Sequence, residues 1–327
     1  MACVSAAEYA AVISQRIQLN TALDWAKARQ LPVHVLGEGS NVLAGAQVPG
    51  LTLINRLQGV RWIATGADTV TVDVASGVSW HWWVCFSSRQ GWHGLENLAL
   101  IPGTVGAAPV QNVGAYGVEC GDFIDRVTAV NLQTGATRYF TQAECEFAYR
   151  DSVFKRAGCG QWFITSVRFV LRRRFTPVLN YRPLDSLHNP TPDELIREVV
   201  AVRQSKLPDP YQIPNAGSFF TNPIVDRTTA DTLQAEWPDM PVFYLASETE
   251  TAGQAKIAAG WLIEQCGWRG FTDPATGVGA YEKQALVLIN PQRRSRQQVL
   301  AMAELIQASV LEKFGLQLEQ EPRLLGL

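Results

Sequence analysis

The sequence predicts an α+β fold with more than one domain, and three observations support this prediction. The chain has 327 residues, of which 47% are hydrophobic and 18% charged, so it has enough apolar material for more than one core. Helical and strand-like patterns both occur, but they do not alternate with the regular period of βαβ units. Two loops of small residues stand in place of a complete dinucleotide-binding fingerprint. Mixed α+β domains are therefore favoured over a single doubly wound sheet.

The first half of the chain is predicted to contain a helix, three strands and a long loop. The helix covers Thr21 to Arg29, with Thr21 as its N-cap. Short apolar or alternating segments predict strands at 31–36, 70–74 and 163–171. Residues 98–117 are too irregular for a helix and too apolar for a disordered linker. We expect a compact loop there, in which the backbone can approach a ligand.

A polar stretch with prolines, residues 172–192, is the best candidate for a domain boundary. Its first residues, Arg172 to Arg174, are interpreted as a solvated strand end, with a phosphate site as the alternative. A helix is predicted to begin at Pro192, because Thr191 and Glu194 have the spacing of a capping box.

The last third of the chain is predicted to contain two helices and two strands. The first helix covers 258–266 and a buried strand covers 285–289. Ser295 begins a long amphipathic helix that ends at Gly315. Leu316 to Glu321 alternates like a strand, which would place Glu319 and Glu321 on one face.

Charge and composition exclude several classes of function. The formal net charge of -2 and the pI near 6.1 provide no strong field for nucleic acid or an anionic membrane. No signal peptide and no apolar run of about 20 residues is visible, so we expect a cytoplasmic protein. The six cysteines lack a CxxC pair and are expected to be reduced core thiols. The four histidines lack paired spacing, so no metal site is expected.

Two glycine-rich loops are the first candidates for ligand binding. Gly37 and Gly39 begin a fingerprint whose third glycine is replaced by Val42, which disfavours a Rossmann site and leaves a phosphate-binding nest as the alternative. The second loop, residues 101–117, could contact a large flat or phosphorylated ligand or could simply connect two strands. Two such loops in one chain favour a dinucleotide-sized ligand.

Three polar clusters could take part in catalysis. They are Tyr149 to Ser152, Asn215 to Phe220, and the pair Glu319 and Glu321. Each cluster alone is more often structural than catalytic. No histidine lies near Ser218 in the sequence, so a hydrolase triad is not supported.

Together these motifs resemble the UDP-N-acetylenolpyruvoylglucosamine reductase family. They run in the order typical of that family and cover nearly the whole chain after about residue 30. The matching segments are GEGSNVL (37–43), GLENLALIPGTVGAAPVQNVGAYG (94–117), YRDSVFK (149–155), KLPDP (206–210), NAGSFFTNP (215–223), AAGWLIEQCG (258–267), QALVLIN (284–290) and LEQEPR (318–323).

The resemblance implies an FAD-binding fold of the vanillyl-alcohol-oxidase type with a C-terminal α+β substrate domain. Residues 1–58 and 59–175 would form two FAD-binding subdomains, the first of them shortened at its N-terminus. Residues 190–315 would bind the substrate, and residues 316–327 would return to the active site.

The resemblance also implies the reaction. NADPH would reduce a non-covalently bound FAD, which would then reduce the enolpyruvyl group of UDP-N-acetylglucosamine enolpyruvate to give UDP-N-acetylmuramate for peptidoglycan synthesis. The enzyme would act as a monomer, without a nucleic-acid or membrane partner and without a metal.

Residue roles follow from the same resemblance. Ser218 would donate a proton to the substrate carbon, while Arg150 and Glu321 would lie near the substrate carboxylate, where an arginine can form a bidentate fork. The positions implied to bind the UDP-sugar are Tyr181, Lys206, Asn222 and Gln284. The positions implied to bind FAD are Gly37, Gly39, Ser40, Asn41, Val42, Pro102, Gly103, Gly106, Ala107, Ala108, Gln111, Asn112, Gly114, Tyr116 and Gly117.

Some positions depart from the family pattern. The early Asn-Thr-Phe-Gly strand is expected to be absent, since the only Asn-Thr pair, Asn20-Thr21, falls in a predicted helix. Thr221 replaces a common lysine, Tyr281 replaces a frequent histidine, and the segment 243–253 does not match. Two rival functions stay open at this point: a flavin oxidase of the same fold, and a non-catalytic flavin or UDP-sugar binding protein.

Overall fold

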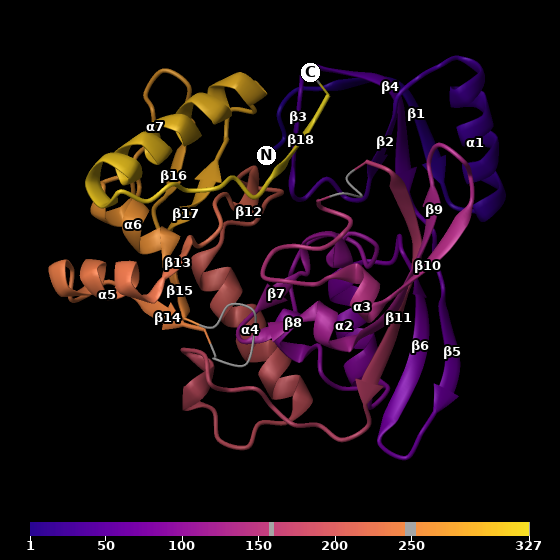
Figure 1. Cartoon of the computed structure of the whole chain (residues 1–327), viewed down its shortest axis with the longest axis horizontal. Coiled ribbons are helices and arrows are strands. Elements are labelled where there is room, and N and C mark those ends of the chain that lie inside the picture. Colours follow the sequence, from indigo (N-terminus) through magenta and orange to yellow (C-terminus); the bar gives the residue numbers. More distant parts are fainter. Residues whose placement is uncertain (157–159, 246–252, 327) are drawn as a thin grey trace. The chain divides into compact units, whose positions relative to one another are not determined.

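The computed structural model (Figure 1) describes residues 1–156, 160–245 and 253–326. Its chain divides into two compact units. The larger unit comprises Ala7–Gly39 and Val48–Gln204. The smaller unit comprises Met1–Ala6, Ser40–Gln47 and Ser205–Leu327. This division groups residues by contact and does not assign binding roles, so the four predicted domain ranges stay predictions.

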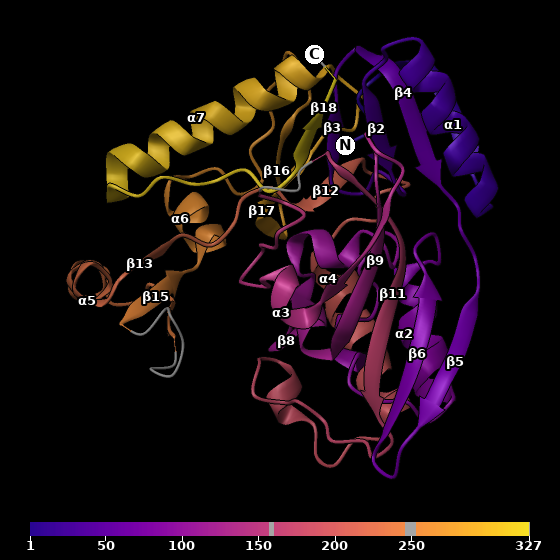
Figure 2. The same cartoon turned by 45° about the vertical axis from the view of Figure 1, so that its right-hand side comes forward.

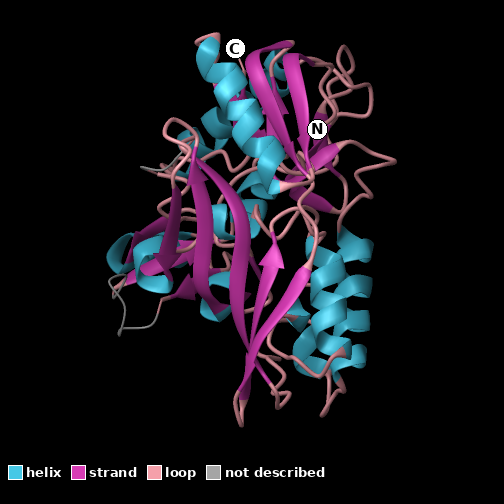
Figure 3. Ribbon diagram, turned by 90° about the vertical axis from the view of Figure 1, so that its right-hand side faces the viewer, coloured by secondary structure: helices cyan, strands magenta, loops and turns pink. Residues whose placement is uncertain are grey.

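Two sheets form the frame of the larger unit. The five-stranded sheet has the order β10-β9-β11-β6-β5 with antiparallel pairing, and the three-stranded sheet has the order β1-β4-β2. Figure 3 shows the long strands of this unit side by side. The strands are β1 (Ala6–Ile13), β2 (Val33–Leu36), β4 (Gln47–Asn55), β5 (Val60–Thr65), β6 (Thr69–Ala75), β9 (Ile124–Asn131), β10 (Thr137–Thr141) and β11 (Trp162–Arg172).

Helices cover these sheets and bury their apolar faces. Helix α1 packs beside β4 (Figure 2), with Leu19 and Leu23 in one core with Leu53. Helix α2, which the sequence analysis missed, buries Trp80 and Trp83 beside Phe169 of β11. The remaining elements of this unit are α1 (Arg16–Ala28), α2 (Trp80–Arg89), α3 (Gln142–Cys145), α4 (Pro192–Lys206), the 3-10 helices η1 (Glu96–Leu98), η2 (Ala108–Gln111), η3 (Cys120–Phe123) and η4 (Leu184–Ser186), and the hairpin of β7 (Gly114–Ala115) and β8 (Val118–Glu119).

The smaller unit contains two antiparallel sheets, β12-β17-β16 and β13-β15-β14, and the parallel pair of β18 and β3. Figure 2 shows the long helix α7 along one side of this unit, and α7 shares a core with α6. The elements are β3 (Val42–Ala44), β12 (Asn215–Ser218), β13 (Ile224–Asp226), α5 (Arg227–Glu236), β14 (Val242–Tyr244), β15 (Gln254–Ile257), α6 (Ala259–Gln265), β16 (Gly279–Tyr281), β17 (Gln284–Ile289), α7 (Arg296–Phe314) and β18 (Arg323–Leu325).

Several predicted elements are confirmed because their signals are local. Thr191 and Glu194 form the expected capping box, with the Glu194 carboxylate accepting the Thr191 N–H at 2.7 Å. Ser295 and Gln298 cap α7 in the same way, and Gly315 ends it in the left-handed region. The arginine run that begins at Arg172 is exposed at the end of β11, as expected for a solvated strand end.

Other predicted elements are wrong. The first helix begins at Arg16, because the Gln18 carboxamide accepts the Gln15 N–H at 2.9 Å and caps it there. Thr21 therefore lies inside the helix, where its hydroxyl donates to the Ile17 carbonyl at 3.2 Å. Strand β1 precedes this helix and was not predicted, because its residues are mostly exposed and give little alternating signal. It contains no Asn-Thr-Phe-Gly motif, so the expected absence of that strand stays a prediction.

The prediction for residues 316–321 is correct in pattern and wrong in type. Leu316 and Leu318 are buried and alternate with exposed residues. The segment forms no strand, and its only bridge joins Gln320 to Phe220. The strand comes later, as β18.

The described ranges also give information on membrane spans, metal-ligand clusters and cysteines. None of the helices seen there has both the length and the apolar character that crossing a membrane requires. The same residues contain no cluster of side chains that could hold a metal ion. The five described cysteines are free, with Cys120 and Cys145 buried, and Cys159 lies outside the described residues.

Candidate active site

The two glycine-rich loops adjoin within the larger unit. The Glu38 carboxylate accepts the Gly103 N–H at 3.0 Å. A Cβ at Gly37 would lie 3.0 Å from the Thr104 Oγ1, so the loop after β2 packs directly against the second loop. The inference of one ligand for both loops thus gains a geometric basis.

Backbone pairing fixes the second loop to the segment that follows β6. The Gly103 carbonyl accepts the Trp80 N–H at 2.9 Å, and the Gly106 N–H donates to the Ser76 carbonyl at 2.8 Å. A Cβ at Gly106 would lie only 2.5 Å from the Ser76 Cβ, so only glycine permits this approach.

Gly39 leaves open space beside the backbone of the first loop. Its φ is +71°, and only the Leu36 Cδ1, at 3.8 Å, lies within 4 Å of a Cβ built there. A side chain would be strained at this φ and would occupy the space through which a ligand can reach the main chain. The open space beside the Gly39 backbone, here called the cradle, therefore fits the phosphates of a dinucleotide.

Both polar atoms of the Asn112 side chain form hydrogen bonds that hold the second loop in place. Its Nδ2 donates to Glu119 at 2.6 Å and to the Ala148 carbonyl at 3.1 Å, and its Oδ1 accepts the Gly121 N–H at 2.9 Å. Asn112 is buried at a left-handed φ of 44°. Asn112 is therefore a scaffold residue of the loop.

Arg150 lies at the hairpin of the same loop. Its Nη2 donates to the Gly114 carbonyl at 2.7 Å, and its own carbonyl accepts from the Lys155 Nζ at 2.7 Å. Its φ is +54°, which is uncommon for a residue with a side chain and is often found at functional sites. The Glu119 carboxylate side chain is a near neighbour, since both it and Arg150 approach the position of a Cβ on Gly114.

Tyr116 contacts one other predicted site residue of the larger unit, Tyr181. Its ring meets that of Tyr181 edge to face, with the centroids 6.0 Å apart. Its carbonyl accepts from the buried Asn97 at 2.9 Å. Burial raises the pKa of the Tyr116 phenol, so this hydroxyl is a hydrogen-bond donor at neutral pH.

In the smaller unit, backbone pairing brings Ser218 and Glu321 together. The Glu321 N–H donates to the Phe219 carbonyl at 2.9 Å, and the Thr221 N–H donates to the Glu319 carbonyl at 3.0 Å. Ser218 and Glu321 are both half-buried. Within the described part of the chain, the Ser218 hydroxyl forms no hydrogen bond.

Asn222 and Gln284 both lie near the beginning of α6. The Asn222 Oδ1 accepts the Ala259 N–H at 3.0 Å. A Cβ at Gly260 would lie 3.0 Å from the Gln284 Oε1, so this side chain lies over the same helical turn. Lys206 is exposed at the last residue of α4.

Ser40, Asn41 and Val42 belong to the smaller unit. The Asn41 Nδ2 donates to the Glu321 carbonyl at 3.5 Å, and the Asn41 carbonyl accepts the Arg323 N–H at 3.0 Å. The predicted FAD-binding segment at residues 40–42 therefore contacts the segment that contains Glu321, a predicted catalytic residue. Of the unmatched stretch 243–253, residues 246–252 lie outside the described residues.

Sequence reasoning missed Arg203. Val199 is buried on α4, and Arg203 follows it by four residues, one helical turn later on the same face. A charged residue on a buried helical face is the signal that could have found it.

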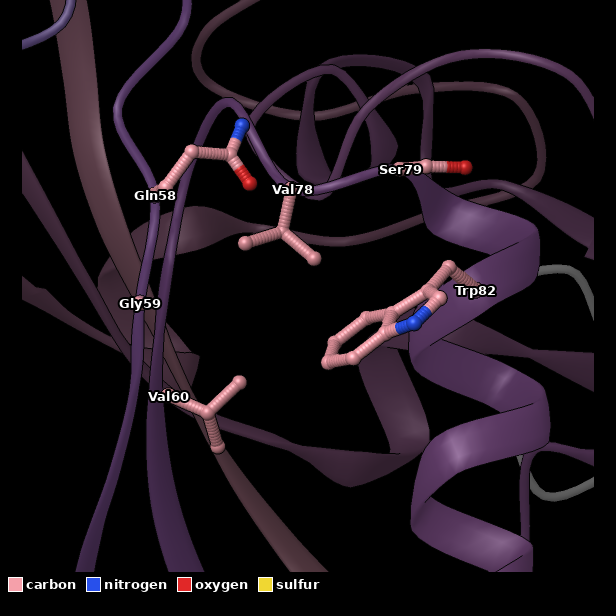
Figure 4. A pocket seen from close by; sticks show the side chains of 6 residues that line it. All are labelled: Gln58, Gly59, Val60, Val78, Ser79 and Trp82. Carbon is pink, nitrogen blue, oxygen red and sulfur yellow. The ribbon is translucent and has the colours of Figure 1, made fainter.

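A pocket of about 370 Å³ in the larger unit contains none of the predicted site residues (Figure 4). In Figure 4 the Trp82 ring points across it toward Val60. Its walls carry no titratable side chain, so the pocket has no group for acid-base chemistry; it is lined by Gln58, Gly59, Val60, Val78, Ser79 and Trp82.

Two family models match the chain. One, for the FAD binding domain, matches residues 8–140. The other, for the C-terminal domain of UDP-N-acetylenolpyruvoylglucosamine reductase, matches residues 209–325.

Whole-length relatives carry one common name, UDP-N-acetylenolpyruvoylglucosamine reductase. The protein from Chromobacterium violaceum is 46% identical, over 91% of this chain and 87% of its own length. The protein from Burkholderia vietnamiensis is 44% identical, over 97% and 91%.

Solved structures support the fold. The UDP-N-acetylenolpyruvylglucosamine reductase of Thermus caldophilus has a TM-score of 0.65 at 22% identity, over 97% of this chain and 91% of that one. A vanillyl-alcohol-oxidase-type flavoprotein from Myceliophthora thermophila has a TM-score of 0.51 at 12% identity, over 94% and 70%. The predicted fold is thereby confirmed.

Proposed function

The chain belongs to the UDP-N-acetylenolpyruvoylglucosamine reductase family, and on that premise we propose which of its residues perform the reaction. The reaction is the reduction of UDP-N-acetylglucosamine enolpyruvate by NADPH, through FAD, to UDP-N-acetylmuramate in peptidoglycan synthesis. The bound flavin supplies the hydride, and the protein supplies binding, orientation and a proton.

Ser218 is the proposed proton donor to the substrate carbon. The observation that carries this proposal is the backbone pair between Phe219 and Glu321, which holds Ser218 and Glu321 on neighbouring segments. A serine hydroxyl is a weak acid, so it must be activated by its surroundings. Because the Ser218 hydroxyl has no described partner, it can turn toward a bound substrate.

Arg150 and Glu321 are proposed to lie at the substrate carboxylate. A guanidinium can hold a carboxylate with two parallel hydrogen bonds and stabilise the charge that develops next to it. The hydrogen bond from Arg150 Nη2 to the Gly114 carbonyl fixes the direction of this side chain. A glutamate beside a second carboxylate is accommodated when it is protonated or bridged by the arginine.

FAD is proposed to lie along the two adjoining loops. The open space at Gly39 and the close approach at Gly106 suit a ligand held by main-chain groups. Asn112 contributes by shaping the loop, because its side-chain groups are already bonded. The other proposed contacts are those of Gly37, Ser40, Asn41, Val42, Pro102, Gly103, Ala107, Ala108, Gln111, Gly114, Tyr116 and Gly117.

The UDP-sugar is proposed to contact Tyr181, Lys206, Asn222 and Gln284. The exposed ammonium of Lys206 suits a diphosphate, since it is a compact charge on a flexible stem. Asn222 and Gln284 would bind from the turn that begins α6. We propose that the enzyme acts as a monomer in the cytoplasm.

The visible spectrum of the purified protein tests the proposal. NADPH should bleach a yellow chromophore, and the enolpyruvyl UDP-sugar should restore it. Acid precipitation should release the flavin into solution, because the predicted binding is non-covalent. Colour retained in the pellet, or oxygen uptake without substrate, would instead support an oxidase.

A further inference from the structure

Arg150 occupies a position in a tight hairpin that residues with a side chain rarely adopt. Ala148 and Asp151 pair across this hairpin, where each N–H donates to the carbonyl of the other residue, at 3.2 and 3.1 Å. Only Tyr149 and Arg150 lie between them, and the φ of Arg150 is +54°. Glycine or asparagine is usual at such a left-handed position, because a Cβ there crowds the following carbonyl. This conformation persists only where neighbouring groups hold it.

Lys155 is the neighbour that holds the Arg150 backbone. Its Nζ donates to the Arg150 carbonyl at 2.7 Å, and a hydrogen bond from an ammonium is stronger than one between neutral groups. Two acids near this turn are paired with Arg156, whose distances to Glu146 and Asp151 are 2.8 and 3.1 Å. Lys155 instead directs its positive charge to the Arg150 carbonyl.

The base of the hairpin is anchored independently of Arg150. The Ser152 hydroxyl belongs to a fully buried residue, donates to the Val110 carbonyl at 2.6 Å and accepts the Phe154 N–H at 3.2 Å. The Lys155 N–H donates to the Ser152 carbonyl at 3.1 Å. The backbone of Lys155 is therefore tied to the second glycine-rich loop through Ser152, and its side chain can support the tip of the hairpin.

Arg150 is held at both ends. Its carbonyl accepts from Lys155, and its Nη2 donates to the Gly114 carbonyl at 2.7 Å. The first contact fixes the backbone from which the side chain starts, and the second fixes the direction of the guanidinium. A change of φ to the usual negative range would redirect the Cα–Cβ bond and move the guanidinium. Electrostatic stabilisation of a developing charge depends on donors that are already in place.

We propose that Lys155 is a positioning residue, which keeps Arg150 in its left-handed conformation and so aims the guanidinium at the substrate carboxylate. Lys155 acts through Arg150 and requires no contact of its own with the substrate. The inference rests on the proposed function, in which Arg150 lies at that carboxylate, and it adds a second residue to this role.

The test compares Lys155→Met with Arg156→Met in the flavin-loaded protein. Both changes remove a cation from the same segment, but only Lys155 contacts Arg150. Lys155→Met should slow reoxidation of the reduced flavin by saturating UDP-sugar by about 10–100-fold, the range for a lost hydrogen bond to a charged group. Reduction by NADPH should stay nearly unchanged. Stopped-flow absorbance measures both rates, and these first-order rates concern only flavin-loaded molecules, so a loss of folded protein does not imitate the result.

Two further variants show whether Lys155 acts through Arg150. Lys155→Arg should recover most of the reoxidation rate, because a guanidinium can donate to the same carbonyl. Arg150→Gly removes the guanidinium and also the strain, since glycine readily adopts a positive φ. In the Arg150→Gly background, Lys155→Met should therefore slow reoxidation no further.

The inference is wrong if Lys155→Met is reoxidised as fast as Arg156→Met. It is also wrong if Lys155→Met slows Arg150→Gly by the same factor as it slows the unmodified protein. A purely structural role would lower the unfolding temperature and the flavin content, and it would leave the reoxidation rate of flavin-loaded molecules unchanged. The proposed function is judged separately, on whether the unmodified protein is bleached by NADPH and restored by the UDP-sugar, and the role of Arg150 is judged on Arg150→Gly alone.

Discussion

The second glycine-rich loop of the larger unit and the Ser218 strand pair of the smaller unit use their polar side chains in opposite ways. In the loop, Asn97 and Asn112 bond to the backbone and set its shape. In the strand pair, backbone groups bond to one another, and the Ser218 hydroxyl has no described partner. In a region that keeps one shape for a permanently bound ligand, polar side chains form hydrogen bonds with the backbone of that region. A region that acts on a transient substrate leaves a reactive side chain uncommitted.

The largest expected effect tests the Ser218 strand pair, the region whose reactive side chain has no described hydrogen bond. Ser218→Ala should leave flavin reduction by NADPH nearly unchanged and should slow reoxidation by the UDP-sugar by about 10²–10⁴-fold, the usual contribution of general acid catalysis. Stopped-flow absorbance follows each half-reaction. Ser218→Cys should retain part of the rate, because a thiol can also donate a proton. Equal slowing of both halves would mean that Ser218 shapes the site and does not donate the proton.

The next effect tests the scaffold side. Asn112→Ala leaves the Gly121 N–H, the Ala148 carbonyl and Glu119 without this partner, so the free energy of unfolding should fall by about 2–4 kcal/mol. Urea unfolding measures this change. Asn20→Ala, at an exposed position of α1, should change stability little. If the Asn112 variant is as stable as its control, Asn112 is not the scaffold described above.

A smaller effect is expected at Lys206. Because its ammonium is exposed and has no described partner, Lys206→Ala should raise the KM for the UDP-sugar by about ten-fold and change kcat less, as expected for a lost ground-state contact. Steady-state kinetics measure both constants. Lys27→Ala, in α1, is the control for removal of an exposed positive charge. An unchanged KM would remove Lys206 from the binding site.

The smallest effect separates backbone strain from ligand contact. Gly39→Ala and Gly135→Ala should each lower the free energy of unfolding by about 1 kcal/mol, because both residues have positive φ, +71° and +72°. Only Gly39→Ala should also reduce the flavin content of the purified protein, since Gly135 lies in a surface turn. Equal flavin content in the two variants would contradict the cradle at Gly39.

Local signals in the sequence predicted part of this structure correctly. The capping residues of α4 and α7 and the alternation of Val70, Val72 and Val74 depend on near neighbours, and these elements were confirmed. The start of α1 was missed because its N-cap is Gln15, where Ser, Thr, Asp or Asn is usual. Strand β1 was missed because its faces are nearly equally exposed.

The candidate site was predicted through motifs, and its details depend on tertiary contacts. The sequence singled out Asn112 but could not reveal that Glu119, Gly121 and Ala148 use all its hydrogen-bonding groups. Arg203 was not predicted as a site residue, because the shielding of its Nε depends on the tertiary fold.

The parallel pair of β3 and β18 has a consequence for the order of events during synthesis. Asn41 and Glu321, which touch beside this pair, are separated by 280 residues. At a translation rate of about 5–20 residues per second, the interval between the synthesis of β3 and that of β18 is some tens of seconds. The larger unit can close during this time, since its residues end at Gln204. The second glycine-rich loop can therefore form early, whereas Ser40 to Val42 of the first loop gain their partners near Glu321 only when synthesis is almost finished.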